Sequence, residues 1–271
     1  MEHSLNREHL LYYNQELAAK SAVQTVFELS TTKDPFEKII LSRDFFINKY
    51  KGNIVLQNSL NYILNGLGKE NLENQLKTKK LMLFKEFSKT KTDITNILNR
   101  KIPRKSTIFL HSLNNTLFES VLNLAKNKEA TLIFLDSHPQ EFGNAMHQSF
   151  KNHKIKHLQF SDLQMGIAIS KSDFCLIGVD AIKKNGNAIV KTGTQTALKV
   201  SKENHTKTYL VANTWGIDTT NSANNLFNQN TQTDTKYEEI IKPVESYITE
   251  QGIFDFEHVV RESKFFNKNL I

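Results

Sequence analysis

One carboxylate and one lysine, Asp180 and Lys191, flank a short hairpin pattern and could serve one binding site. Asp180 directly follows the apolar run FCLIGV, so its carboxylate is expected at the end of a buried strand. The Asn-Gly pair in KKNGNAIVK predicts a tight turn that returns the chain beside this strand and brings Lys191 near Asp180. A lysine there would lower the pKa of the carboxyl group, whereas a dry pocket would raise it.

The segment KTGTQTALKVSKEN, which follows the hairpin, predicts a helix whose start could bind an anion. Gly193 and Thr194 open this helix, and the first amide groups of a helix attract anions such as phosphate. The acid, the lysine and the helix start together describe a site for a small phosphorylated ligand. An ordinary strand-to-helix turn with an incidental ion pair explains the same residues equally well.

The residues before about position 103 are expected to form a helical domain. Apolar residues recur at three- and four-residue intervals in EHLLYYNQELAAKSAVQTVFELS, which is the period of an amphipathic helix. Asp34 before Pro35 marks the start of a further helix, and Gly66 and Gly68 mark a stop between later ones. The sequence therefore predicts a helical bundle over residues 1–103.

Residues 104–271 show a different pattern, in which short apolar runs alternate with segments of helix length. The expected strands are STIFLHS, TLIFLDS, IKHLQFS, FCLIGVD and TYLVANT, and the expected helices are NTLFESVLNLAKN, FGNAMHQSFKNH and TALKVSKEN. Continuous apolar strands separated by helices favour a parallel sheet covered on both faces. Ligands of such sheets gather beyond the carboxyl ends of the strands. Those ends hold His111, Ser112, Asp136 to Pro139, Asp180 and Asn213 to Trp215.

Two later segments have patterns of their own. Residues 219–236, TTNSANNLFNQNTQTDTK, are rich in asparagine and threonine and predict an exposed loop rather than a binding element. The segment YEEIIKPVESYITEQGIFDFEHVVRES, residues 237–263, has helical periodicity and is expected to pack on the sheet or on a partner.

Composition narrows the classes of function. The chain has 271 residues, 39% of them hydrophobic, and a formal net charge of +7. The basic residues are scattered without interleaved aromatic residues, which favours solvated helix faces over a specific nucleic-acid groove. A single cysteine, Cys175, rules out an intramolecular disulfide and a cysteine metal cluster, and no other spacing indicates a metal site. No apolar run approaches the roughly 18 residues of a membrane span, so we expect a soluble cytoplasmic protein.

The stretch IGVDAIKKNGNAIVKTGTQTALKVSKENHTKTYLVANT resembles the signature of the alpha, beta and delta subunits of translation initiation factor 2B. The same family includes methylthioribose-1-phosphate isomerase and ribose-1,5-bisphosphate isomerase. Its pattern, a strand ending in G-A-D, then N-G, then K-x-G-T opening a helix, is matched by Gly178, Asp180, Asn185, Gly186, Lys191, Gly193 and Thr194. The resemblance implies an α/β fold: an N-terminal helical domain followed by a Rossmann-like domain with a mostly parallel sheet.

The chain departs from the isomerases of this family at several positions. The resemblance implies that they use a cysteine at the end of the first strand together with the aspartate matched by Asp180. Here Ser112 takes the place of the cysteine, and a serine hydroxyl is a far weaker acid than a thiol. Two arginines of the family are replaced here by Lys20 and His138. The position of a further family arginine falls near Tyr50 and Lys51. Neither lysine nor histidine reproduces the bidentate hold of arginine on phosphate.

Three aromatic side chains near the strand ends allow two interpretations each. His111 and His138 could act as a base or contact phosphate, although a histidine at a strand end is more often structural. Trp215 could stack on a ligand, but a partly buried interface residue is the more common role.

The resemblance implies a dimerising regulatory module that binds a sugar phosphate or nucleotide and lacks isomerase activity. The expected ligand residues are Lys20, His138, Lys191, Gly193 and Thr194. No cofactor or metal is expected, and the expected partners are a second copy or a related subunit. The alternative is an aldose-ketose isomerase of a phosphorylated pentose, with Asp180 and Ser112 as its catalytic residues. RNA binding through the basic surface is a third, weaker interpretation.

Overall fold

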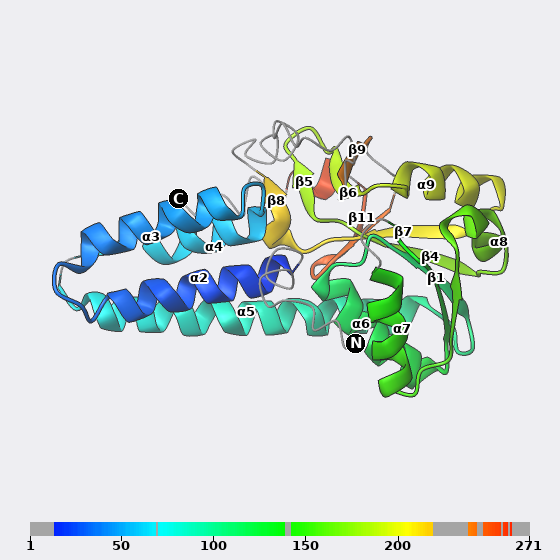
Figure 1. Ribbon diagram of the computed structural model, residues 1–271, viewed down its shortest axis with the longest axis horizontal. Coiled ribbons are helices and arrows are strands. Elements are labelled where there is room, and N and C mark those ends of the chain that lie inside the picture. The colour runs from blue at the N-terminus through cyan, green and yellow to red at the C-terminus, as the bar shows by residue number, and fades with distance from the viewer. Residues whose placement is uncertain are drawn as a thin grey trace.

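A computed structural model describes residues 14–68, 70–138, 142–218, 238–242, 246–255, 257–259 and 261. Figure 1 shows an arm of helices that projects from one side of a part built of strands and helices. The predicted fold class, helices followed by an α/β unit with a mostly parallel sheet, is confirmed.

The arm consists of the helices α2 (Gln15–Leu29), α3 (Pro35–Lys49), α4 (Ile54–Leu64) and α5 (Leu72–Lys101). Residues 8–13, the start of the first predicted helix, lie outside the described residues. Asp34 stands before α3 as predicted, but its backbone is left-handed, with φ of 53°, and its side chain makes no capping hydrogen bond. The predicted stop at Gly66 is present between α4 and α5, where the residue has a φ of 63°.

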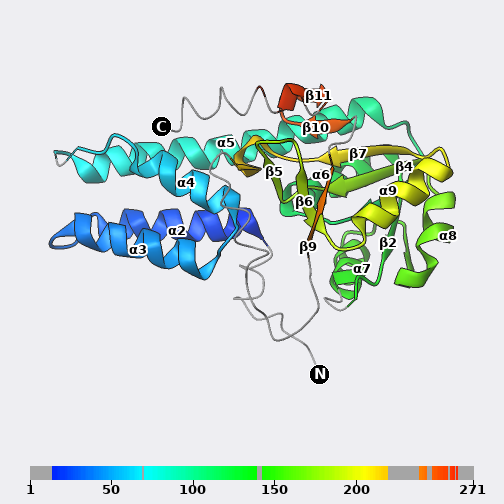
Figure 2. The same ribbon diagram turned by 90° about the horizontal axis from the view of Figure 1, so that it is seen from above.

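Helix α5 joins the arm to the α/β part. Its 30 residues span about 45 Å at 1.5 Å per residue. Leu76 and Leu83 near its start are buried in the core of the arm. Ile94 and Leu98 near its end are buried in a core that includes sheet residues. Figure 2 shows this continuity from above. The domain boundary predicted at residue 103 therefore lies just after α5, a helix whose side chains pack in both cores.

All five predicted strands are present in a seven-stranded sheet of order β11-β10-β7-β4-β1-β2-β3. They are β1 (Thr107–His111), β2 (Thr131–Leu135), β3 (His157–Phe160), β4 (Phe174–Gly178) and β7 (Lys207–Val211). These strands pair in parallel, with Phe109 opposite Cys175 in the central pair. The predicted helices are α6 (Asn115–Lys128), α7 (Phe142–Asn152) and α9 (Thr194–Glu203). The helix α8 (Met165–Ser170), preceded by a 3-10 turn at Asp162–Gln164, was not predicted.

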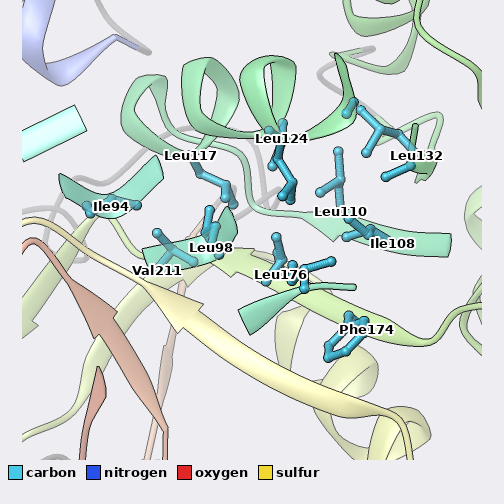
Figure 3. Packing of buried hydrophobic residues seen from close by; sticks show 14 of the residues in the cluster. Ile94, Leu98, Ile108, Leu110, Leu117, Leu124, Leu132, Phe174, Leu176 and Val211 are labelled. Carbon is cyan, nitrogen blue, oxygen red and sulfur yellow. The ribbon is translucent and has the colours of Figure 1, made fainter. Parts of the chain in front are cut away.

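Alternate strand residues enter two cores, one on each face of the sheet. Ile108 and Leu110 of β1 pack with α5 and α6, as Figure 3 shows for the side chains on this face. Phe109, the residue between them, enters the opposite core with residues of α8 and α9. This double burial explains why the strands are continuous apolar runs.

The prediction of helix for residues 237–263 is wrong for most of the described part of that segment. It contains the strands β9 (Glu238–Ile241), β10 (Tyr247–Thr249) and β11 (Gly252–Phe254). β10 pairs in parallel with β7, and its Tyr247 and Ile248 are fully buried. Backbone groups at the edge of β7 need partners, and this requirement outweighs a weak local helical pattern.

A second sheet of order β8-β5-β6-β9 carries the predicted hairpin. Its strands β5 (Ala181–Lys183) and β6 (Ala188–Lys191) pair antiparallel around the Asn-Gly turn, and β8 (Ile217–Asp218) and β9 flank them. The loop predicted at residues 219–236 lies outside the described residues. Within the described part of the chain, no helix is both long and apolar enough to span a bilayer.

Candidate functional site

The predicted meeting of Asp180 and Lys191 is confirmed. The Lys191 Nζ atom lies 2.8 Å from the Asp180 Oδ2 atom, and both side chains are largely buried. The amide of Asp180 donates to the carbonyl of Ile189 on β6 at 2.9 Å, which ties the end of β4 to the returning strand. The hairpin thus positions a buried ion pair beyond the carboxyl end of the sheet, as the alternation of strand and turn signals indicated.

Ser112, immediately after β1, is bound into this arrangement. Its Oγ atom accepts a hydrogen bond from the amide of Lys191 at 2.9 Å, and its φ of 51° is left-handed. Gly178 leaves room for this turn, because a Cβ atom added at Gly178 would lie 2.1 Å from the Ser112 carbonyl oxygen. The structure therefore brings Ser112, Asp180 and Lys191 together, with the hydroxyl holding the backbone of Lys191.

The start of α9 is occupied by a carboxylate of the chain itself. Gly193 has a φ of 96° and precedes the helix, and the hydroxyl of buried Thr194 donates to the carbonyl of Lys191 at 2.7 Å. The amide of Gln195 donates to the Glu239 Oε1 atom at 2.6 Å. Phosphate binding at this helix start stays a prediction, and a phosphate there would compete with Glu239. Glu239 was missed in the sequence because its strand β9 was predicted as helix.

The two candidate histidines lie in different settings. His111 is buried, stacks on Phe109 with ring centroids 6.3 Å apart, and lies close to Gly193. Burial lowers the pKa of His111 to about 4, against a backbone hydrogen bond with Thr192 that raises it. His111 is therefore neutral at pH 7. His138 is exposed, and its backbone amide donates to the Asp162 Oδ2 atom at 2.8 Å.

Lys20 belongs to an ion-pair network between α2, α5 and α6. Its Nζ atom lies 2.6 Å from Glu16 Oε1, and it also lies over the ring of Phe87. Lys91 of α5 bridges Glu16, at 3.1 Å, and Glu119 of α6, at 2.9 Å. The carboxylate of Glu16 is thus approached by two lysines, and Lys20 is held in the arm.

A recess opens beside Asp180, between the start of α2, α4 and the start of α6. It is shallow: the space of about 290 Å³ beside these residues includes open solvent, and its closed part has room for about one water molecule. Its polar lining residues are Gln15, Glu16, Asn114, Asn115, Thr116, Asp180 and Asn213, and Val55 and Val179 complete the wall. The sequence pointed to Asp180 and Asn213, at strand ends. The others were missed because no local pattern relates α2 to the start of α6, although Asn114 has the position of a helix cap.

A short 3-10 element, Thr214–Gly216, links the recess to the arm. Trp215 is buried against Tyr62 and Phe87, with ring centroids 5.6 and 5.5 Å away. The Asn58 side chain of α4 donates to the carbonyl oxygens of Trp215 and Ile217. Trp215 is therefore an interface residue between the two parts, which was the more common of its two interpretations.

The opposite side of this element is held by Glu250, in the turn between β10 and β11. Its carboxylate accepts from the amide and the hydroxyl of Thr214. Burial raises the pKa of Glu250, against the hydrogen bonds from Thr214, which lower it. Among the described residues, no group of three or more His, Cys, Asp or Glu side chains could hold a metal ion.

The amino-acid sequence matches the model of a known protein family. The model of the Initiation factor 2 subunit family matches residues 10–255. The chain belongs to this family.

Individual relatives support the assignment over part of the chain. An eIF-2B subunit 2-like protein of Pyrococcus horikoshii is 24% identical over 146 residues, which are 54% of this chain and 53% of that protein. One of Pyrococcus furiosus is 25% identical over 48% of each chain. The match thus spans about half the length of these curated relatives.

Solved structures of the family share the fold over nearly the whole chain. Translation initiation factor eIF-2B of Pyrococcus horikoshii superimposes with a TM-score of 0.77 at 20% identity, covering 90% of this chain and 92% of that one. The 5-methylthioribose 1-phosphate isomerase of the same organism gives 0.75 at 13% identity, covering 95% and 86%. A chain of the tetrameric eIF2B-beta2-delta2 complex of C. thermophilum gives 0.71 at 13%, covering 97% and 92%. Since both kinds of protein share the fold, it does not separate a regulator from an isomerase.

Proposed function

We propose that this member of the Initiation factor 2 subunit family is a dimerising regulatory module that binds a small molecule beside Asp180 and lacks isomerase activity. The observation that carries the proposal is the state of Ser112. Its hydroxyl oxygen accepts from the Lys191 amide, at the place where the resemblance implies a cysteine in the isomerases.

Moving a carbonyl between two sugar carbons requires a proton donor and a proton acceptor near those carbons. Serine is a far weaker acid than cysteine. The Ser112 hydroxyl oxygen also accepts a hydrogen bond from the backbone amide of Lys191. The other expected acid-base group, Asp180, lies in an ion pair with Lys191 at 2.8 Å. The chain therefore retains the frame of the site with one of its two implied catalytic side chains.

The ligand implied by the resemblance is a sugar phosphate or a nucleotide. Lys20, His138, Lys191, Gly193 and Thr194 are proposed to contact it, as the sequence predicts. The solved complex of related beta and delta subunits supports assembly of this chain with a second copy or a related subunit. Its single, buried Cys175 suits the reducing cytoplasm that we propose as its compartment.

A second candidate function, an aldose-ketose isomerase of a phosphorylated pentose, is favoured by one observation. Asp180 is buried and lines the recess, which is where a proton shuttle would have to lie. The fold shared with the 5-methylthioribose 1-phosphate isomerase is compatible with this function. The missing thiol places it second.

Turnover measurements separate the two functions. We expect no conversion of ribose-1,5-bisphosphate or methylthioribose-1-phosphate by the unmodified protein, and a thermal melt would show that it is folded. Robust turnover that disappears in Asp180→Asn would replace the regulatory function with the enzymatic one. The variant Ser112→Cys is the informative companion, because it restores the thiol at the implied position.

A further inference from the structure

The edge of the large sheet at which its parallel strands begin concentrates positive charge. This amino edge consists of the segments that enter β1, β2, β3, β4 and β7, namely residues 101–106, 126–130, 151–156, 171–173 and 202–207. It holds eleven Lys and Arg residues against three Asp and Glu residues, which is a formal net charge of +8. The whole chain has a net charge of +7, so this edge accounts for all of the excess positive charge.

The opposite edge of the sheet, beside the candidate site, has the reverse composition. The segments that directly follow the same five strands are residues 112–114, 136–138, 161–164, 179–180 and 212–218. They contain four aspartates and neither lysine nor arginine. The lysines are scattered in the sequence, but the parallel sheet gathers them at one of its two ends, on the side away from the arm (Figure 1). A polyanion would therefore be attracted to the amino edge.

Backbone hydrogen bonds join these segments into one continuous row. The amide of Lys105 donates to the carbonyl of Lys128 at 2.7 Å, and the amide of Leu132 donates to the carbonyl of Lys156 at 3.0 Å. The five strands are consecutive in the sheet order, so the row extends about 19 Å at the usual spacing of strands. Over such a length, one strand of a nucleic-acid duplex presents about five phosphates.

Most of the cations in this row are not engaged by acids of the chain. Six of them lie outside the helices, so complementing a helix dipole does not account for them. All six are exposed, and they are Arg104, Lys105, Lys154, Lys156, Lys171 and Lys207. Arg104 pairs with Glu129. Within the described part of the chain, the other five form no ion pair with a carboxylate.

The composition of the amino edge indicates which polyanion it fits. It contains no Phe, Trp or Tyr, and its isoleucines, Ile102 and Ile155, are buried. Protein interfaces favour aromatic residues and are depleted in lysine, and membrane-surface helices insert apolar side chains. Single-stranded nucleic acids rely on stacking with aromatic side chains. A duplex can be held through its phosphates by cations alone.

We propose that the amino edge docks the sugar-phosphate backbone of double-stranded RNA without reading its sequence. RNA is the duplex present in the cytoplasm, which is the compartment proposed above. This activity is additional to the proposed binding of a small molecule, because the amino edge and the candidate site lie at opposite ends of the sheet strands.

Fluorescence anisotropy of a labelled RNA duplex of about 16 base pairs, titrated with the full chain, tests this inference. A dissociation constant of about 1–100 µM at physiological salt is expected, within about twofold for unrelated sequences. The logarithm of the association constant should fall with the logarithm of the salt concentration, with a slope of about −3 to −5. Single-stranded RNA of the same length, polyglutamate and vesicles of anionic lipid should each bind at least about threefold more weakly.

A triple variant locates the binding on the amino edge. Lys105→Gln, Lys156→Gln and Lys207→Gln together remove one exposed cation from the start of each of β1, β3 and β7. The variant should bind the RNA duplex at least about tenfold more weakly, and its salt slope should be smaller by about 2–3, because three phosphate contacts are lost.

The matched control removes the same charge from the arm. Lys38→Gln, Lys77→Gln and Lys85→Gln are exposed substitutions in α3 and α5, and this variant should bind the duplex within about twofold of the unmodified protein. Thermal melts check that both variants are folded. Equal losses in the two variants would assign the affinity to net charge and overturn the inference. So would tighter binding of single-stranded RNA, polyglutamate or vesicles than of the duplex, or no binding of the duplex at physiological salt.

Discussion

At the scale of single residues, the candidate site around Asp180 contains charged and hydrogen-bonding groups whose partners belong to the chain itself. Asp180 and Lys191 are largely buried, and their mutual attraction offsets part of the cost of removing both charges from water. The buried ring of His111 carries no charge at pH 7, because burial lowers its pKa to about 4. Cys175 is also buried, and burial raises the pKa of its thiol to about 11, so it is a packing residue rather than a nucleophile.

Replacing one member of the ion pair should be costly. Lys191→Met leaves Asp180 without its cation and should lower the free energy of unfolding by about 3–5 kcal/mol, measured by urea denaturation. The double variant with Asp180→Asn should recover part of that loss. Lys184→Met, at an exposed position of the same hairpin, should change stability by less than about 0.5 kcal/mol. If Lys191→Met were as stable as Lys184→Met, the ion pair of Asp180 and Lys191 would contribute nothing to the free energy of unfolding.

His111 should make the protein sensitive to mild acid. Its pKa of about 4 in the folded chain lies below the ordinary 6.5, so the unfolded chain binds the proton more readily. Stability from this residue is present above pH 6.5 and falls toward pH 4, by up to about 3 kcal/mol. His111→Phe, which keeps a ring beside Phe109, should show a smaller loss when urea unfolding is compared at pH 7 and pH 4.5. An unchanged loss would assign the acid sensitivity to other groups.

At the scale of elements, the site exists because the ends of β1 and β4 approach closely. Residues after β1 turn with Ser112 in a left-handed conformation, and its carbonyl points at Gly178, the last residue of β4. The hairpin β5–β6 then returns Lys191 to the same place. Ser112 and Asp180 are thus held by neighbouring parallel strands, at the edge where such sheets bind ligands.

Gly178→Ala tests this close approach. The added Cβ atom would lie 2.1 Å from the Ser112 carbonyl, and backbone cannot yield cheaply, so we expect a loss of about 3 kcal/mol or more in urea denaturation. Gly166→Ala in α8 is the matched control, since nothing lies within 4 Å of the added atom. It should be neutral or stabilising by up to about 1 kcal/mol. Equal effects of the two substitutions would contradict the proposed fit of β4 against Ser112.

At the scale of the whole molecule, the arm and the α/β part are joined at two places. Helix α5 is buried in both cores, and the element Thr214–Gly216 places Trp215 in the arm while Glu250 holds it from the other side. The recess is lined by residues of both the arm and the α/β part, so its shape depends on how the two parts are held together. Outside this junction, the α/β part exposes the apolar side chains Leu158, Leu163, Ile167 and Ile240.

The proposed regulatory function predicts association of two chains, with these exposed apolar side chains as candidate interface residues. Apolar side chains left in water favour burial at an interface. Sedimentation of the full chain should show a stable species of twice 31.2 kDa at micromolar concentration. The association should persist at high salt, because it rests on apolar contact rather than charge. A single 31.2 kDa species under those conditions would rule it out.

The amino-acid sequence was enough to predict the helical arm, the five parallel strands, the hairpin and the meeting of Asp180 with Lys191. These features depend on local periodicity and turn chemistry, which a single chain displays directly. The remaining features depend on contacts between segments that are distant in the sequence. Residues of β10 became strand because the edge of β7 needed partners, and Glu239 reached α9 only because β9 joined the second sheet. Likewise, Glu16 and Asn115 face Asp180 across a recess because α5 holds the arm against the sheet, a relation between distant segments that no local pattern encodes.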